Sequence, residues 1–122
     1  MAIIGSHMLL YSSEAGALRS VLRDGLGMKC VDAGHGWLIF KLPPSELGVH
    51  PAEGPASQSR GLHQISFMCD DLGETMAELR AKGVRFAGEP QNAGFGTTVT
   101  MVLPGDVNVM LYQPRHPLAI DA

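Results

Sequence analysis

The sequence predicts an α+β fold in which one domain contains two modules of element order βαβββ. The first observation is internal repetition: residues 4–51 and 62–114 each read as a strand, a helix that a glycine closes, and three further strands. The second is the length of 122 residues, which suits a single domain. The third is the content of 15 glycines and 8 prolines, which favours short elements and frequent turns.

Module one, residues 4–51, begins with an apolar strand over residues 7–12. Ser13 or Glu14 opens its helix, because a side-chain oxygen there accepts a hydrogen bond from a free backbone N–H group. Gly25–Gly27 ends the helix. Its apolar stripe consists of Leu18, Val21 and Leu22. After a short strand, two runs rich in β-forming residues predict the strands Trp37–Leu42 and Leu47–His50.

Module two, residues 62–114, has the same order of elements, and its helix boundaries are marked more clearly in the sequence. Asp70 or Asp71 caps its helix and Gly83 ends it, as helix boundaries favour these residue types. The apolar stripe consists of Leu72, Met76 and Leu79. The last two strands are predicted over Thr97–Leu103 and Val107–Tyr112. Residues 52–61 read as a linker between the modules, and residues 115–122 as a C-terminal tail.

Composition excludes several classes of partner. The net charge is −3 and the Lys and Arg residues are scattered singly, so we expect no nucleic-acid partner. No apolar run is long enough to span a membrane, and the N-terminus lacks the basic start of a signal peptide. Cys30 and Cys69 have no metal-binding or disulfide spacing and read as reduced thiols. We therefore expect a cytoplasmic protein without a membrane partner.

Several catalytic motifs are missing from the sequence. It contains no GxSxG nucleophile elbow, no GxxxxGK[ST] phosphate loop and no HExxH metal motif. A cysteine–histidine nucleophile pair stays open, but alternation along the strand before Asp70 places Cys69 on the helix side of the sheet with Ile65 and Phe67. Gly94-Phe95-Gly96 is too short for a phosphate cradle and predicts a turn.

The doubled element order and its motifs resemble the vicinal oxygen chelate superfamily, which includes glyoxalase I, bleomycin-resistance proteins and extradiol dioxygenases. The similar motifs are HMLLYSSEAGAL…GLG in module one and DDLGETMAELRAKGV…GFG…LPGDVNVMLYQP in module two, and the resemblance covers residues 4–116. It implies that the sheets form a curved cup with the helices on its convex side and a ligand inside. It says little about activity, since members of one fold catalyse unrelated reactions.

The resemblance also implies where a divalent metal (Zn, Ni, Mn or Fe) would be held: by side chains of the first and last strands of each module. In this sequence the matching residues are His7 and Gln64, with His63 as the alternate to Gln64. The matching position in the last strand of module one is Gly48, and Glu46, or His50 as its alternate, is the candidate ligand beside it. Met110 stands where the family usually has a glutamate, and a thioether is a poor ligand for such a metal. The set is therefore incomplete. Gly5-Ser6-His7-Met8 also matches the remnant of a cleaved tag, although the apolar run that continues into Tyr11 favours native sequence.

Strand alternation predicts which side chains line the cup. Val107, Val109 and Leu111 would face the helix of module two, and Leu47 and Val49 that of module one. The cup would be apolar and aromatic with a few polar groups, as small-molecule sites usually are. The ligand-binding candidates are His7, Leu9, Tyr11, Trp37, His50, Gln64, Met68, Phe95, Met110 and Tyr112. His35 and His116 fall in a predicted loop and in the tail, and we assign them no role.

Two classes of function follow. The first is a protein that holds a small organic molecule in the cup without catalysis. The alternative is a metal-dependent lyase, isomerase, thiol transferase or dioxygenase. The methionine at position 110 favours the binding protein, and His7 favours the enzyme. We also expect a homodimer, because open sheet edges and a charged fraction of only 17% leave apolar surface to cover.

Overall fold

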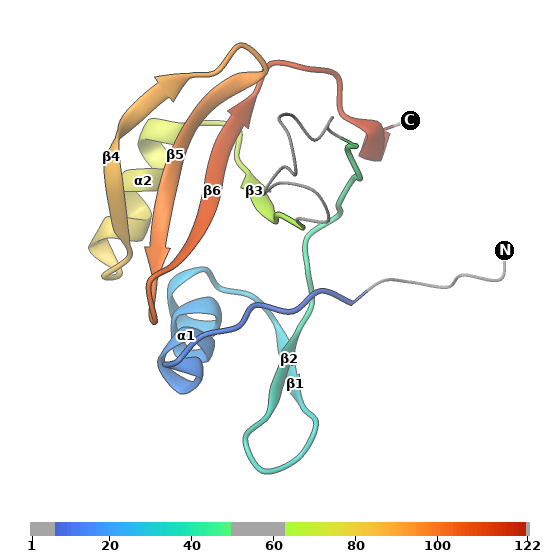
Figure 1. The fold of residues 1–122 in the computed structure, drawn as a ribbon, viewed down its shortest axis with the longest axis vertical. Coiled ribbons are helices and arrows are strands. Elements are labelled where there is room, and N and C mark those ends of the chain that lie inside the picture. Colours follow the sequence, from blue (N-terminus) through green and yellow to red (C-terminus); the bar gives the residue numbers. More distant parts are fainter. Residues whose placement is uncertain (1–6, 50–62, 122) are drawn as a thin grey trace, which may run out of the picture.

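The computed structural model describes residues 7–49 and 63–121 and is a mixed α+β structure with two sheets (Figure 1). The predicted fold class is confirmed. In chain order the elements are α1 (Ala15–Ser20), η1 (Val21–Gly25), β1 (Cys30–Asp32), β2 (Leu38–Phe40), β3 (Ser66–Met68), α2 (Leu72–Ala81), β4 (Arg85–Asn92), β5 (Gly96–Leu103), β6 (Val107–Pro114) and η2 (Ala119–Asp121). In the described ranges, no helix has the length and apolar character that crossing a bilayer requires.

Module two has the predicted βαβββ order. Its four strands lie in the order β3-β6-β5-β4, with β3 parallel to β6 and the other pairs antiparallel. Helix α2 lies behind this sheet (Figure 1). The Asp71 side chain accepts a hydrogen bond of 3.0 Å from the Glu74 N–H and so caps the helix. Gly83 follows the helix with φ +87°, a left-handed conformation that glycine adopts without strain.

The core lies between α2 and the sheet, and it confirms the predicted alternation in β6. Val109 and Leu111 are buried beside Met101 and Val99 of β5, their partners in the strand register. The helix contributes the buried residues Leu72, Met76 and Leu79. The opposite face of the sheet therefore carries the alternate residues of each strand, including Met68, Thr98, Met110 and Tyr112.

Module one has fewer strands than predicted. The helix spans α1 and then one π-helical turn, η1, and it buries Leu18 and Leu22 against the core. The only sheet in the described part of this module is the antiparallel pair β1–β2, in which Cys30 lies opposite Phe40. The predicted strand over residues 7–12 is wrong, since that segment has no strand structure.

The predicted strand Leu47–His50 is also wrong over its described part. Residues 47–49 have no strand structure, and His50 lies outside the described residues. Leu47 and Val49 are 91% and 93% exposed, so neither faces the helix as expected. An alternating apolar pattern forms a strand only when a neighbouring strand accepts its hydrogen bonds, and no described strand pairs with this segment.

The two modules meet where the N-terminal segment reaches the turn between β5 and β6. The Ser12 hydroxyl donates a hydrogen bond of 2.6 Å to the Pro104 carbonyl oxygen. The Gly105 N–H donates one of 2.8 Å to a Glu14 carboxylate oxygen. These two bonds fix the start of α1 below that turn (Figure 1).

Candidate functional site

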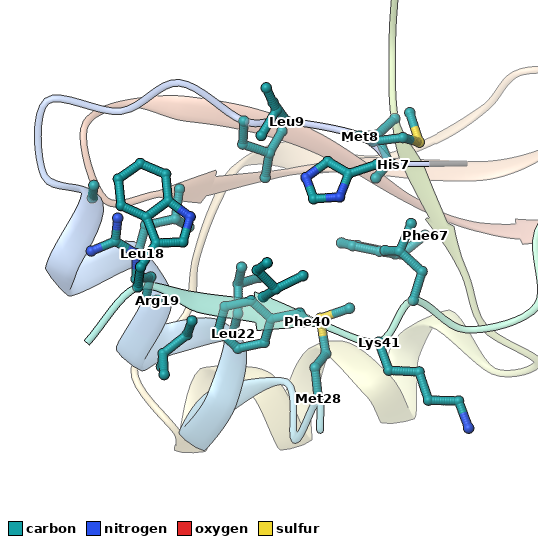
Figure 2. Close-up of a pocket in the computed structure, with 17 residues that line it drawn as sticks. His7, Met8, Leu9, Leu18, Arg19, Leu22, Met28, Phe40, Lys41 and Phe67 are labelled. Atoms are coloured by element: carbon teal, nitrogen blue, oxygen red, sulfur yellow. The ribbon is translucent and has the colours of Figure 1, made fainter. Parts of the chain in front are cut away.

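A first cavity of about 400 Å³ lies between the N-terminal segment, α1 and the β1–β2 pair. Figure 2 shows His7, Met8 and Leu9 along one side and Leu22, Met28 and Phe40 along the other, with Phe67 of β3 closing one end. Most of these side chains are apolar or aromatic.

A second cavity of about 640 Å³ adjoins the first. Residues 42–46 form one side, residues 64–70 another, and the C-terminal segment after β6 a third. Both cavities share the side chains of Met8, Leu42, Ile65 and Phe67 as a common wall. The start of β3 therefore separates two spaces to which both modules contribute residues.

Arg19 is a cation of the first cavity that lies against an aromatic ring. It lies in the last turn of α1, half-buried, with its guanidinium carbon 4.9 Å from the centre of the Trp37 ring. That distance is within the range of a cation–π interaction, which holds the guanidinium plane over the ring. The edges of the guanidinium group stay available as hydrogen-bond donors.

A polar network borders the second cavity and links β6 to the tail. The Tyr112 phenol oxygen lies 3.1 Å from His116 Nε2, and Nε2 lies 3.8 Å from a Glu46 carboxylate oxygen. His116 Nδ1 lies 2.8 Å from the Pro117 carbonyl oxygen. Because a carbonyl only accepts, Nδ1 is the donor to Pro117. In the tautomer with the proton on Nδ1 alone, Nε2 accepts a hydrogen bond from the Tyr112 hydroxyl.

The network changes the acidity of Tyr112. Burial of the side chain, together with the negative charge of Glu46, raises the pKa of the Tyr112 phenol above its ordinary value of 10.0. Phe95 packs edge-on against the phenol ring with 5.5 Å between ring centres. Tyr112 is therefore a neutral hydrogen-bond donor at physiological pH rather than a base.

Cys69 does not have the features of a nucleophile. Burial raises the pKa of its thiol, which favours the unreactive protonated form. Its sulfur lies 3.6 Å from the Tyr112 carbonyl oxygen and packs against the core. These contacts agree with the helix-facing position expected from the strand pattern.

Only some of the predicted site residues line the two cavities, and Tyr11, His63, Phe95, Met110 and Tyr112 line neither. His7, Leu9 and Trp37 line the first, and Glu46, Gln64 and Met68 line the second. Tyr112 contacts His116, which lines the second cavity, and Met110 lies half-buried on the same sheet face as Tyr112. Tyr11 is 85% exposed and lines neither cavity. His63 is also exposed and is not part of either cavity lining. His50 lies outside the described residues.

The described side chains do not fit a divalent-metal site. Glu46 and Gln64 line one cavity, whereas His7 lines the other. Within residues 7–49 and 63–121, no three His, Cys, Asp or Glu side chains are grouped so that they could hold a metal ion. Met110 occupies the position where the family resemblance implies an acid. We therefore derive no chemical step that passes through a metal.

Sequence reasoning missed two residues of the site. His116 was given no role, although it follows Tyr112 by four residues and contacts it. Arg19 is absent from the predicted site, although it lines the first cavity. The contact of Arg19 with Trp37 depends on how separate segments pack, and no local signal in the sequence marks it. For His116 the sequence carries only the weak signal of a histidine four residues after a tyrosine.

Comparison with protein families assigns the chain to one of them. The family model described as Glyoxalase/Bleomycin resistance protein/Dioxygenase superfamily matches residues 6–109, and the chain belongs to this superfamily. The resemblance inferred from the motifs is thereby confirmed. A search of curated proteins finds no match.

Solved structures support the fold. TnmS3, an antibiotic binding protein from Streptomyces sp. CB03234, is 22% identical with a TM-score of 0.64, covering 93% of this chain and 98% of its own. A superfamily member from Sphaerobacter thermophilus is 19% identical with a TM-score of 0.60, covering 93% and 99%. A lactoylglutathione lyase from Agrobacterium tumefaciens has the same identity and TM-score, covering 93% and 94%. At these identities the likeness concerns the fold alone, which in these proteins accompanies different activities.

Proposed function

We propose that this protein binds a small organic molecule in the two adjoining cavities and does so without a metal. The observation that carries the proposal is the pair of cavities with a shared apolar wall. Their volumes of about 400 and 640 Å³ lie in the usual range of small-molecule sites, about 300–1,000 Å³. The antibiotic-binding protein of similar fold is consistent with this function.

The proposal also covers the cellular compartment and the oligomeric state of the protein. Cys30 and Cys69 are unpaired, which suits the reducing conditions of the cytoplasm. Large apolar side chains on the surface of module one favour a homodimer in which a second copy covers them. The proposed protein is thus a cytoplasmic, dimeric binding protein.

A neutral probe tests the binding function. N-phenyl-1-naphthylamine gains fluorescence in apolar cavities, and we expect it to bind saturably with micromolar affinity. Met8→Trp should weaken this binding at least tenfold, because Met8 belongs to the wall shared by both cavities and a larger side chain fills space there.

Tyr11→Trp is the matched control for this variant. It also introduces an indole into the N-terminal segment, but Tyr11 lines neither cavity, so binding should be unchanged. Absence of saturable binding to the unmodified protein would overturn the proposed function. Equal binding by the unmodified protein and the Met8→Trp variant would show that the probe sits elsewhere, and this would overturn the assignment to these cavities.

A further inference from the structure

The first cavity carries positive charge in a protein that is negative overall. The net charge of the chain is −3, yet the described lining contains His7, Arg19 and Lys41 and no Asp or Glu. The second cavity differs, since Glu46 and Asp70 line it. An anionic ligand would therefore be attracted to the first cavity and repelled by the second.

Arg19 lies where it could bind an anion. Among the described residues it forms no ion pair with an Asp or Glu, unlike Arg23 and Arg85. The Trp37 ring supports one face of its guanidinium group. A planar guanidinium held in this way presents paired N–H donors, the arrangement that binds both oxygens of a carboxylate.

The other basic groups have secondary positions. The His7 ring points into the space between Leu9 and Phe67 (Figure 2). Lys41 lies at the edge of the cavity, with its amino group directed away from the centre (Figure 2). Lys41 therefore adds positive potential at the entrance, whereas Arg19 is the residue placed for direct contact.

The walls indicate what the rest of the ligand is. Phe40 and Phe67 provide aromatic surfaces, and Met28 and Leu22 provide thioether and aliphatic surfaces around the same space (Figure 2). Aromatic and sulfur-containing side chains pack favourably against flat rings. A volume of about 400 Å³ accommodates a small ring system rather than a macrocycle.

We infer that the first cavity binds a small aromatic carboxylic acid, with the carboxylate on Arg19 and the ring between Phe40 and Phe67. This inference rests on the proposed function and names the chemical class of its ligand. It assigns to Arg19 the role of distinguishing an acid from its neutral analogue. Lys41 increases the affinity for the anion without setting its orientation.

A pair of matched probes tests the inference. 2-Naphthoate and 2-naphthamide have the same rings and differ in charge, and their binding is measured by calorimetry. Trp37 is the only tryptophan of the chain and lies in this cavity, so its fluorescence reports whether a probe binds there. We expect 2-naphthoate to bind at least tenfold more tightly than 2-naphthamide, and to change the fluorescence of Trp37.

Substitution of Arg19 identifies the contact. Arg19→Met should lower the affinity for 2-naphthoate at least tenfold and leave that for 2-naphthamide unchanged. Arg80→Met is the matched control, because Arg80 also lies over an aromatic ring, 5.3 Å from the centre of Phe86, but lines neither cavity. Arg19→Lys keeps the charge without the planar donors, and we expect intermediate affinity, which also guards against a folding defect in Arg19→Met.

The outcomes separate the inference from the proposed function. Equal affinity for the two probes, or an Arg19→Met variant that binds 2-naphthoate as the Arg80→Met control does, would overturn the inference. The inference would also be overturned if neither 2-naphthoate nor 2-naphthamide binds while N-phenyl-1-naphthylamine does. In each of these cases the proposed function stands. If none of the three probes binds, both fall.

Discussion

Tyr112 shows at the scale of one residue how burial and a neighbouring charge act together. Both disfavour the phenolate, and so the pKa of the folded-state phenol lies above the ordinary value of 10.0. The folded protein then binds more protons than the unfolded chain at pH values above 10.0. Linkage requires that the stability contributed by Tyr112 be fully present below pH 10.0 and be lost as pH rises through the folded-state pKa.

This effect can be measured directly. The chain has two tyrosines, so in the Tyr11→Phe variant the ultraviolet absorbance of phenolate reports Tyr112 alone. We expect its midpoint to lie above that of the same variant unfolded in guanidinium. Adding Glu46→Gln should lower the folded midpoint, because it removes the nearby negative charge. Coincident midpoints for the folded and unfolded protein would refute the argument.

The turn between β5 and β6 illustrates how an element depends on one glycine. Gly105 has φ +84°, and a Cβ atom there would collide with the Ser12 hydroxyl that bonds to Pro104. We expect Gly105→Ala to lower the free energy of unfolding by about 2–3 kcal/mol, from left-handed backbone strain and loss of that hydrogen bond. Urea denaturation measures the change.

Gly94→Ala is the control for backbone strain. Gly94 has a similar φ of +83° and open space around its Cβ position, so the loss there should be about 1–2 kcal/mol. The difference between the two losses in unfolding free energy measures what the contact between Ser12 and the β5–β6 turn contributes to stability. If Ser12→Ala in the Gly105→Ala background recovers nothing, the collision with Ser12 is not the cause.

The elements also show which sequence signals were sufficient. Helix α2 could be predicted because Asp71, the spacing of Leu72, Met76 and Leu79, and Gly83 act locally and agree. In module one, β2 lies inside the predicted strand Trp37–Leu42. The strand expected at Leu47–His50 could not be judged from sequence, because the pattern around Leu47 contains no information about a partner strand. The candidate site was also predictable only in part. Single lining residues could be predicted from strand alternation. The contact between Tyr112 and His116 could not, nor could that between Arg19 and Trp37, because both depend on packing between segments.

At the scale of the whole molecule, apolar exposure is unequal between the modules. Among the described residues, module two exposes only Phe95 as a large apolar side chain, and the C-terminal tail exposes Ile120. The exposed large apolar side chains of module one are Met8, Leu9, Tyr11, Val31, Trp37, Ile39, Leu47 and Val49. Met8, Leu9, Trp37 and Ile39 line the first cavity. The exposed side chains that line neither cavity are Tyr11, Val31, Leu47 and Val49, and such a set is typical of an interface rather than of a free surface. In the proposed dimer, a second copy would cover Leu47 and Val49, which are exposed in the single chain.

The dimer therefore has a specific test. Sedimentation at tens of micromolar protein should give twice the chain mass of 13.0 kDa. Leu47→Asp combined with Val49→Asp should shift the mass towards 13.0 kDa, because an unpaired charge in an apolar interface is costly to desolvate. Ile120→Asp places the same charge on an exposed apolar residue of the tail and should leave the dimer intact. A mass of 13.0 kDa for the unmodified protein would contradict the dimer, and a double variant that stays dimeric would place the interface on another surface.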